Sequence, residues 1–256
     1  MKLSIVIPVY NELPTLGRIL CAVSEALPAV EKDIVIVDDG STDGTAHWLR
    51  ANFPERTRRG TRIGLTADGN LMFVNRESGP TIDVQARLLP ANRGKGAALR
   101  EGFAHASGEI VVIQDADLEY DPQDWVRMYA LIATKRVADV VFGSRFYGEP
   151  HRSLYFYHYV ANRLISRLFS LLNNQTLTDV EACYKMMRIE VLRSLRLTAD
   201  DFGIELEIAT EIARARDWRI YEVGIGYYGR TYAEGKKIGW QDGFKALWYL
   251  LKYRLR

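Results

Sequence analysis

Five short apolar runs punctuate the chain up to residue 143, and amphipathic segments separate most of them. The runs cover residues 3–9, 33–37, 86–89, 109–114 and 139–143. Runs of this length are typical of strands buried on both faces of a parallel sheet. The amphipathic segments predict helices at about 14–27, 42–53, 95–106 and 122–134. This alternation predicts an α/β fold, a Rossmann-like, mostly parallel sheet flanked by helices.

The segment 54–90 interrupts the alternation. It is rich in Arg, Thr and Gly, and residues 63–74 read as a hairpin around Asp68-Gly69, a dipeptide that favours tight hairpin turns. We interpret most of this segment as an insertion with its own small β element. The prediction is therefore a single domain over residues 1–256 with an insertion at about 54–90.

After Arg145 the pattern changes to longer amphipathic helices. Helical periodicity covers 154–172 and about 204–216, and a short strand is predicted at 219–223. The chain ends in a predicted amphipathic helix over about 240–255, whose apolar stripe has basic residues near its polar flank. Basic residues together with Trp suit a helix that lies in a membrane interface, and docking onto the domain itself is the alternative.

The overall charge is nearly balanced, because 34 Lys and Arg face 32 Asp and Glu, a formal net charge of +2. This balance predicts no nucleic acid partner. Residues 214–256 hold ten Lys or Arg against four Asp or Glu, and such a basic end suits phosphate groups or an anionic membrane surface. No stretch reaches the roughly 18 apolar residues that span a bilayer, so any membrane contact is expected to be peripheral.

Chain-wide signals also favour a cytoplasmic protein. The apolar opening at 3–9 is too short for a signal peptide and is broken by Pro8. Cys21 and Cys183 lack metal-ligand spacing and read as buried, reduced thiols. The four histidines form no ligand pattern.

Asp115-Ala116-Asp117 follows the apolar run at 109–114 and is the most informative chemical feature. Open α/β sheets bind their ligands beyond the carboxyl ends of the strands. Two carboxylates two residues apart can bind Mg²⁺ or Mn²⁺ and leave coordination positions for diphosphate oxygens. Taken alone, the triplet fits a solvated turn as well.

Two more strands end in loops that suit a nucleotide. Residues 8–12 (Pro-Val-Tyr-Asn-Glu) close the first strand, and residues 38–45 (Asp-Asp-Gly-Ser-Thr-Asp-Gly-Thr) close the second. Carboxylates and amides there can hydrogen-bond a nucleobase and ribose, and the glycines let the backbone approach the ligand. Residues 92–96 (Asn-Arg-Gly-Lys-Gly) start a helix, and they either touch the ligand or serve only that start.

These motifs, in this order, resemble the inverting glycosyltransferases of family 2, which have the GT-A fold. The segments that carry the resemblance are 8–12, 37–45, 92–99 and 115–118. Within that family the likeness is to polyprenyl-phosphate (dolichyl-phosphate) mannosyl or glucosyl transferases, on residues 141–145, 178–185 and 228–240. Two positions depart from the pattern, Cys183 where Gly is common and Glu119 where Gln is common.

The resemblance implies which residues hold the donor, a nucleotide diphosphate-sugar such as GDP-mannose or UDP-glucose. The donor-binding residues would be Pro8, Tyr10, Glu12, Asp38, Lys95, Asp115 and Ala116. Asp115 and Asp117 would place a divalent metal, Mg²⁺ or Mn²⁺, on the diphosphate, with Asp117 as the direct ligand. The metal would neutralise charge on the leaving nucleoside diphosphate.

The acceptor implied by the resemblance is a lipid phosphate, polyprenyl or dolichyl phosphate. The cations expected to grip phosphate are Arg145, Lys185, Arg230, Lys236 and Lys237. Guanidinium groups match phosphate geometry. A phosphate monoester has its second pKa at about 6, so it can attack the anomeric carbon without a general base. Positioning and charge stabilisation, by Asp117 and Arg145 above all, would then carry the catalysis.

Two other functions stay open at this stage. One is a family 2 glycosyltransferase that acts on a saccharide hydroxyl, which would need a general base, with Asp179 or Glu181 as candidates. The other is a non-catalytic module that binds a nucleotide-sugar. The first reading predicts a cytoplasmic protein at the cytoplasmic face of the membrane, and it leaves the sugar, the choice of metal and the oligomeric state open.

Overall fold

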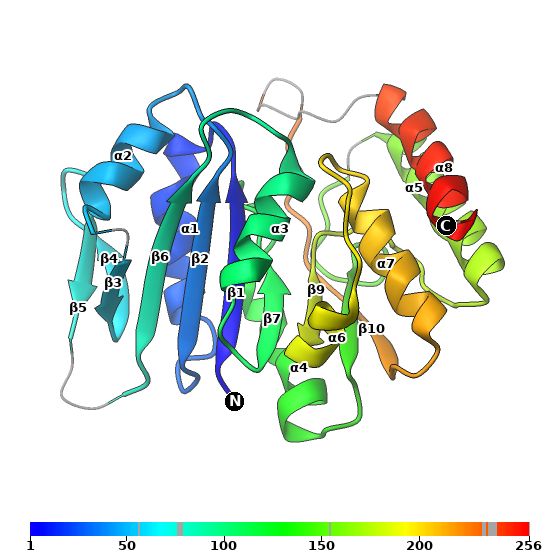
Figure 1. Ribbon diagram of the computed structural model, residues 1–256, viewed down its shortest axis with the longest axis horizontal. Coiled ribbons are helices and arrows are strands. Elements are labelled where there is room, and N and C mark those ends of the chain that lie inside the picture. The colour runs from blue at the N-terminus through cyan, green and yellow to red at the C-terminus, as the bar shows by residue number, and fades with distance from the viewer. Residues whose placement is uncertain (56, 76–78, 154, 232–233, 235–239, 256) are drawn as a thin grey trace.

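The structure is a computed structural model of residues 1–256, and it describes all of them except 56, 76–78, 154, 232–233, 235–239 and 256. Eight of the described strands form one sheet in the order β10-β8-β9-β7-β1-β2-β6-β3 (Figure 1). Their bounds are β1 Leu3–Val9, β2 Lys32–Asp38, β3 Thr57–Gly60, β6 Ile82–Leu88, β7 Ile110–Ile113, β8 Val140–Ser144, β9 Lys185–Arg188 and β10 Ile220–Gly224.

Most neighbours in this sheet are parallel. Strand β1 pairs with β2 and β7, β2 pairs with β6, and β8 pairs with β10, all in parallel. Strands β3 and β9 are antiparallel to their neighbours. The predicted class, a mostly parallel α/β sheet flanked by helices, is confirmed.

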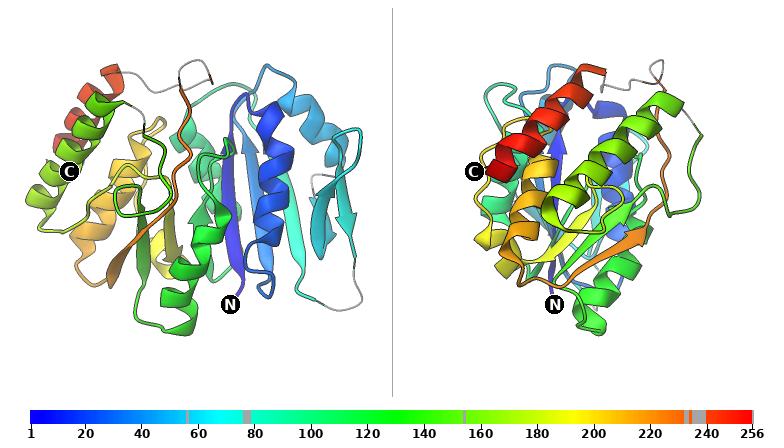
Figure 2. Two further views of the ribbon diagram at one scale, coloured as in Figure 1. Left: turned by 180° about the vertical axis from the view of Figure 1, so that it is seen from behind. Right: turned by 90° about the vertical axis from the view of Figure 1, so that its right-hand side faces the viewer.

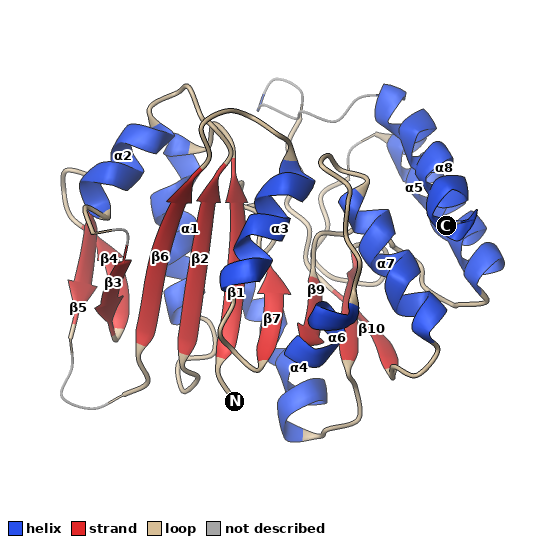
Figure 3. Cartoon of the chain, in the orientation of Figure 1, coloured by secondary structure: helices blue, strands red, loops and turns tan. Residues whose placement is uncertain are grey.

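Helices cover both faces of the sheet (Figure 3). Their bounds are α1 Leu13–Glu25, α2 Thr45–Asn52, α3 Lys95–His105, α4 Trp125–Tyr129, α5 Phe156–Asn173, α6 Ile189–Ser194, α7 Ile204–Ala215 and α8 Trp240–Leu255. A 3₁₀ turn at Pro122–Asp124 precedes α4, and a π-helical turn at Ala130–Thr134 follows it. The first turn is capped by Asp121, whose side chain accepts from the Gln123 backbone N–H, so the helical stretch begins where the sequence predicted it.

The segment 54–90 contributes more to the main sheet than predicted. The hairpin is present as the antiparallel pair β4 (Arg62–Leu65) and β5 (Leu71–Val74). The following strand, however, starts at Ile82 instead of residue 86 and pairs with β2 along its whole length. Strand β3 then adds an antiparallel edge to β6.

Strand β9 was not predicted. It has four residues, Lys-Met-Met-Arg, which lack both alternation and a long apolar run. It forms because it fills the gap between β7 and β8, where its antiparallel hydrogen bonds close the sheet. This placement brings the preceding residues, 178–184, beside the carboxyl ends of β7 and β8.

Helices α5, α7 and α8 gather at the β10 end of the sheet. Helix α8 packs against both α5 and α7, and Figure 2 shows α5 and α8 side by side. Among the described residues, no helix has both the length and the apolar character needed to cross a membrane.

Candidate functional site

A cavity of about 1060 Å³ lies at the carboxyl edge of the sheet. Strands β1, β2 and β7 end at this edge, which is the upper edge in Figure 1. The predicted donor residues in its wall are Pro8, Tyr10, Glu12, Lys95, Asp115, Ala116 and Asp117. Sequence positions more than a hundred residues apart therefore meet in one wall, because parallel strands bring their carboxyl ends together.

Lys95 lies at the start of α3 and joins two carboxylates. Its Nζ is 2.7 Å from Asp115 Oδ1 and 3.0 Å from Glu205 Oε1. Glu205 is at the start of α7, so this lysine connects the donor loops to the second half of the chain. These two carboxylates raise the pKa of Lys95 despite its burial, and the side chain is therefore charged.

Asp117 faces a guanidinium group. Arg230 Nη2 donates to Asp117 Oδ2 at 3.0 Å, and Arg230 also lies 3.4 Å from Glu12 Oε1. Burial and the nearby charges of Asp115 and Glu119 nevertheless raise the pKa of Asp117 to about 7. This cluster has more carboxylates than the surrounding cations neutralise.

Glu119 anchors the loop that carries Arg230. Its carboxylate accepts from Arg230 Nε at 3.1 Å, from the Arg230 backbone N–H at 3.0 Å and from the Tyr227 hydroxyl at 3.0 Å. Glu119 stands where Gln is common in the family pattern. The structure explains it, because a carboxylate can accept all three donors and a Gln amide would place a donor group among them.

Arg145 and Asp179 form a two-point ion pair. Arg145 Nε and Nη2 each donate to Asp179 at 2.7 Å, and the Arg145 backbone N–H donates to it at 2.9 Å. The side chain of Asp179 is 0% exposed, and only Arg145 reaches the cavity wall. This corrects the prediction of Asp179 as a candidate general base, because both of its oxygens bind Arg145, which it positions.

Lys185 does not reach the cavity either. It is fully buried in β9, where its Nζ donates to Ala182 O and to Glu205 Oε2, both at 2.5 Å. The prediction that it binds the acceptor phosphate is corrected, because it forms an internal ion pair. Glu205, the partner of Lys185, also contacts Lys95. Lys185 therefore holds Glu205 in place from the protein interior.

The two aspartates at the end of β2 have different surroundings. Asp39 lines the cavity and accepts from the Arg93 and Gly94 backbone N–H groups at 2.8 and 2.7 Å, which makes it a residue that shapes the loop. Asp38, predicted to hold the nucleotide, is 0% exposed and lies outside the cavity wall. Its Oδ1 has no hydrogen-bond partner among the described residues.

Of the predicted phosphate-binding cations, Arg145 and Arg230 line the cavity. Lys236 and Lys237 lie outside the described residues. Glu181 and Cys183 also line it, although the sequence reasoning treated Glu181 only as a base candidate and Cys183 only as a departure. The unpredicted strand β9 is what brings them there.

Much of the cavity wall is aromatic. Besides Tyr10, the aromatic side chains lining it are Tyr120, Phe146, Tyr155, Phe156, Tyr159, Phe202, Tyr227 and Tyr249. The sequence analysis assigned none of them to the site. The run at 155–159, Tyr-Phe-Tyr-His-Tyr, was the available signal, because so many aromatic residues at the start of one helix exceed what core packing requires.

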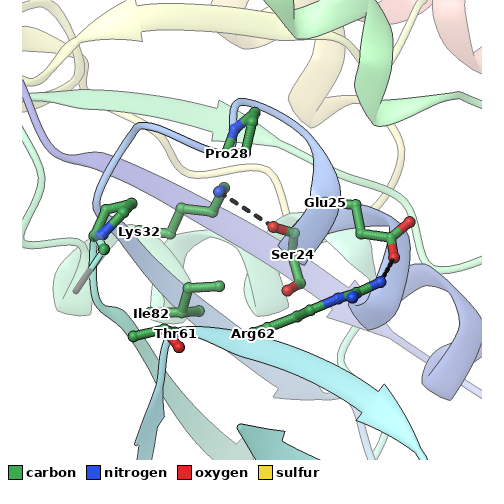
Figure 4. A pocket seen from close by; sticks show the side chains of 9 residues that line it. Ser24, Glu25, Pro28, Lys32, Thr61, Arg62 and Ile82 are labelled. Atoms are coloured by element: carbon green, nitrogen blue, oxygen red, sulfur yellow. Dashed lines mark hydrogen bonds and ion pairs between the residues drawn. The ribbon is translucent and has the colours of Figure 1, made fainter. Parts of the chain in front are cut away.

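A smaller hollow of about 340 Å³ lies between the end of α1 and strands β2, β4 and β6 (Figure 4). Lys32 Nζ donates to the backbone oxygens of Ser24 and Leu27, and Arg62 pairs with Glu25. These charged groups are engaged with the protein itself. The convergence of the sequence motifs therefore makes the larger cavity the candidate site.

The chain is similar in sequence to two named mannosyltransferases. The chain is 26% identical to the dolichol-phosphate mannosyltransferase of Pyrococcus furiosus over 249 residues, which is 93% of this chain and 61% of that protein. It is 28% identical to the undecaprenyl-phosphate mannosyltransferase of Micrococcus luteus over 249 residues, which is 93% of this chain and 88% of that protein. The chain thus spans about three fifths of the archaeal relative and most of the bacterial one.

The fold also matches solved structures. Glucosyl-3-phosphoglycerate synthase from Mycobacterium tuberculosis, in complex with Mn²⁺, UDP-glucose and phosphoglyceric acid, superposes with a TM-score of 0.67 at 18% identity, covering 99% of this chain and 79% of that one. The fold is accordingly the GT-A fold. The family described as Glycosyl transferase family 2 matches residues 4–63 and 81–196, leaving out a stretch shorter than the predicted insertion. The chain belongs to Glycosyl transferase family 2.

Proposed function

We propose that this protein transfers a hexose from a nucleotide diphosphate-sugar to a polyprenyl phosphate, with inversion at the anomeric carbon. One observation carries the proposal. A single cavity joins an acidic end, with Asp115 and Asp117, to an aromatic end at α5 and α8, and Arg145 lies in the same wall. The acidic end suits a metal-bound diphosphate, and the aromatic end suits an isoprenoid chain beside its phosphate.

The donor end fits a divalent cation. Asp115 and Asp117 would hold it, and the raised pKa of Asp117 reflects a carboxylate cluster that is short of positive charge. Within the described part of the chain no three His, Cys, Asp or Glu side chains group around one point, so diphosphate oxygens would complete the coordination. The cation, Mg²⁺ or Mn²⁺, would neutralise charge on the leaving nucleoside diphosphate.

The chain's own residues would position the two substrates. Lys95 and Arg230 would face the donor diphosphate, and the strand-end residues Pro8, Tyr10 and Glu12 would hold the nucleoside. Asp38 joins this proposal through its unpaired Oδ1, which a donor hydroxyl or N–H could satisfy if the loop opens. Asp179 orients Arg145, which still has Nη1 without a hydrogen bond among the described residues and can receive the acceptor phosphate.

The acceptor phosphate would need no general base. It is largely ionised near neutral pH and can attack the anomeric carbon directly, while Arg145 offsets its charge repulsion with the diphosphate. A saccharide hydroxyl would need a base instead. Asp179 is unsuited to that task because both of its oxygens bind Arg145, which leaves Glu181 for this alternative.

The names of the relatives support the acceptor class. Two of them are named for transfer to dolichol phosphate or undecaprenyl phosphate, and both are mannosyltransferases. The solved structure, in contrast, holds UDP-glucose. We therefore propose a lipid phosphate as acceptor, encountered at the cytoplasmic face of a membrane, and either GDP-mannose or UDP-glucose as donor.

The test is a transfer assay with purified protein. Polyprenyl phosphate in detergent is incubated with Mn²⁺ or Mg²⁺ and radiolabelled UDP-glucose or GDP-mannose, and label is counted in the organic phase. The matched variants are Asp117→Asn, which removes a predicted metal ligand, and Asp68→Asn, which changes a carboxylate in the distant β4–β5 turn. We expect metal-dependent label with one donor, lost in the first variant and kept in the second.

Two other results would reject the proposal. Nucleotide release only when a saccharide is added would indicate the hydroxyl-acceptor function. Tight nucleotide-sugar binding without turnover on any acceptor would indicate a non-catalytic binding module.

A further inference from the structure

Glu181 is an unpartnered carboxylate in the wall of the cavity. It lines the cavity directly, and its carboxylate makes no hydrogen bond or ion pair within the described part of the chain. Other acidic side chains of the wall are engaged by the protein: Glu119 and Glu205 each hold a cation, and Asp39 accepts from backbone N–H groups. Glu181 is half-buried, so its carboxylate has lost part of its hydration without gaining a protein partner, which points to a ligand that supplies hydrogen-bond donors.

Its neighbours in sequence locate it between the two ends of the site. Two residues before it, Asp179 grips Arg145, the cation at the acceptor end. Two residues after it, Cys183 lies near Asp115 at the donor end, where burial and this neighbouring carboxylate raise the pKa of its thiol. The intervening Val180 and Ala182 are buried in the core. Within the segment 179–183, Glu181 and Cys183 line the cavity, and Glu181 stands in sequence between the partner of Arg145 and the neighbour of Asp115.

We propose that Glu181 recognises the hexose during transfer by accepting hydrogen bonds from its hydroxyl groups. The inference rests on the proposed function, since the transferred sugar must lie between the diphosphate it leaves and the phosphate it joins. Glu181 is the acidic side chain of the wall that has no hydrogen bond or ion pair within the described part of the chain. It would select the sugar, while the nucleotide is held elsewhere.

The chemistry of the group fits this task. An ionised carboxylate only accepts hydrogen bonds, and a sugar presents adjacent hydroxyl donors that can bind both of its oxygens. A site built to hold a hydroxyl rejects an analogue that lacks it far more strongly than an apolar pocket rejects a missing methylene. The pKa of Glu181 is raised to about 7, chiefly by burial; Asp179 and Glu205 contribute to the rise, and Arg145 and Lys185 oppose it. Hydrogen bonds from two sugar hydroxyls would lower the pKa of Glu181 and favour its ionised form.

Binding measurements without any acceptor test the inference. Dissociation constants are measured for UDP, GDP, UDP-glucose and GDP-mannose, and for deoxy analogues of the donor that binds, on wild type, Glu181→Gln and Glu181→Ala. Glu101→Gln, on the outer side of α3, is the control carboxylate. Thermal unfolding of each variant first establishes that it folds.

We expect both Glu181 variants to bind the free nucleotide like wild type and the nucleotide-sugar about tenfold more weakly. One deoxy analogue should bind to wild type about as weakly as the complete nucleotide-sugar binds to Glu181→Ala. The Glu181→Ala substitution should not weaken binding of that analogue any further. Glu101→Gln should match wild type throughout. Equal nucleotide-sugar affinity in wild type and both Glu181 variants would overturn the inference, and loss of turnover alone would then make Glu181 a base for a hydroxyl acceptor.

The two proposals fail separately. If wild type labels lipid but the Glu181 variants bind every donor normally, the transfer reaction stands and the sugar contact is wrong. If wild type labels no lipid but Glu181 couples to one hydroxyl of the donor, the sugar contact stands and the acceptor class is wrong.

Discussion

At the scale of single residues, the site is a chain of ion pairs. Glu205 contacts both Lys95 and Lys185, Lys95 contacts Asp115, and Arg230 contacts Asp117. Each of these side chains therefore has an opposite charge beside it before any ligand arrives, while the carboxylates around Asp117 still outnumber their cations. Such preorganisation costs desolvation, but it spares the site from reorganising during the reaction.

The Arg145–Asp179 pair allows a direct test of this interpretation. Asp179→Asn should lower the free energy of unfolding by about 3 kcal/mol, because it leaves the Arg145 guanidinium without its buried counter-charge. Adding Arg145→Met should restore part of the loss. Urea unfolding of the single and double variants measures the coupling, with the exposed pair of Glu25 and Arg62 as a control that should cost less than about 1 kcal/mol. A loss in Asp179→Asn no larger than the control's would show that the pair is not organised by burial.

Lys32 should make stability depend on pH in an alkaline window. Burial lowers its pKa to about 8, and its Nζ donates only to backbone oxygens among the described residues. Between about pH 8 and its ordinary value of 10.5, the unfolded chain binds the proton that the folded chain has lost, so stability rises with pH.

The gain across this window should be on the order of 2 kcal/mol. Urea midpoints of wild type and Lys32→Met from pH 7.5 to 10.5 measure it, because tyrosines and thiols titrate alike in both proteins. The difference between the urea midpoints of wild type and Lys32→Met should change between about pH 8 and pH 10.5. Parallel curves would show that the pKa of Lys32 is not lowered.

At the scale of elements, α3 and β9 organise the site. Helix α3 begins at Lys95 against the loop before α7, and Gly96 makes this close approach possible, since a methyl group there would overlap the Ala199 carbonyl oxygen. Gly94, at φ +99, lies against the Asp200 carbonyl in the same way. The Gly-Lys-Gly motif thus serves the packing that brings Lys95 to Asp115 and Glu205.

Gly96→Ala should therefore destabilise the protein by about 2 kcal/mol, although alanine ordinarily favours a helix. It should also weaken nucleotide-sugar binding, because α3 must shift and carry Lys95 with it. Gly243→Ala in α8 is the matched control: no atom of the described residues lies within 4 Å of its new methyl group, so it should be neutral or slightly stabilising. Thermal unfolding and titration with the nucleotide-sugar measure the stability and the affinity of both variants. Equal stability and affinity in Gly96→Ala and Gly243→Ala would show that the close approach at Gly96 is unimportant.

At the scale of the whole molecule, the cavity opens beside an exposed apolar face. Helix α5 presents Tyr157, Leu164 and Leu171 at 85%, 51% and 78% exposure, although its other side packs on the core. Helix α8 presents Trp248, Leu251 and Leu255 beside the exposed Lys245 and Lys252. Apolar groups of this size flanked by lysines suit contact with an anionic membrane interface.

Replacing Tyr157, Leu164 and Leu171 together by Ser should weaken binding to vesicles of phosphatidylcholine and phosphatidylglycerol by about tenfold or more. Vesicle co-sedimentation measures the change. Met72→Ser combined with Val126→Ser removes similarly exposed apolar groups away from α5 and α8 and should leave vesicle binding unchanged. Equal loss in both variants would mean that the protein has no membrane-facing side.

Much of the fold was predictable because the relevant signals are local. The strands that became β1, β2, β7 and β8 are apolar runs bounded by polar loops, and their physical cause lies within the run itself. Strand β9 was missed because its four residues carry no periodicity and pair only in response to β7 and β8. The predicted strand at 86–89 was shorter than β6, because apolar and polar residues alternate over Ile82–Leu88 and leave no continuous apolar run.

The sequence by itself determined the fold class and the family, because both depend on local patterns: apolar runs and the motifs at the strand ends. Only the tertiary structure decided which charged residues face the cavity. Asp179, Lys185 and Asp38 are buried, whereas Glu181 and the aromatic groups of α5 line the wall. The physical reason is that a side chain's exposure depends on neighbours distant in sequence, and an ion pair that satisfies a charge inside the fold removes it from the substrate's reach.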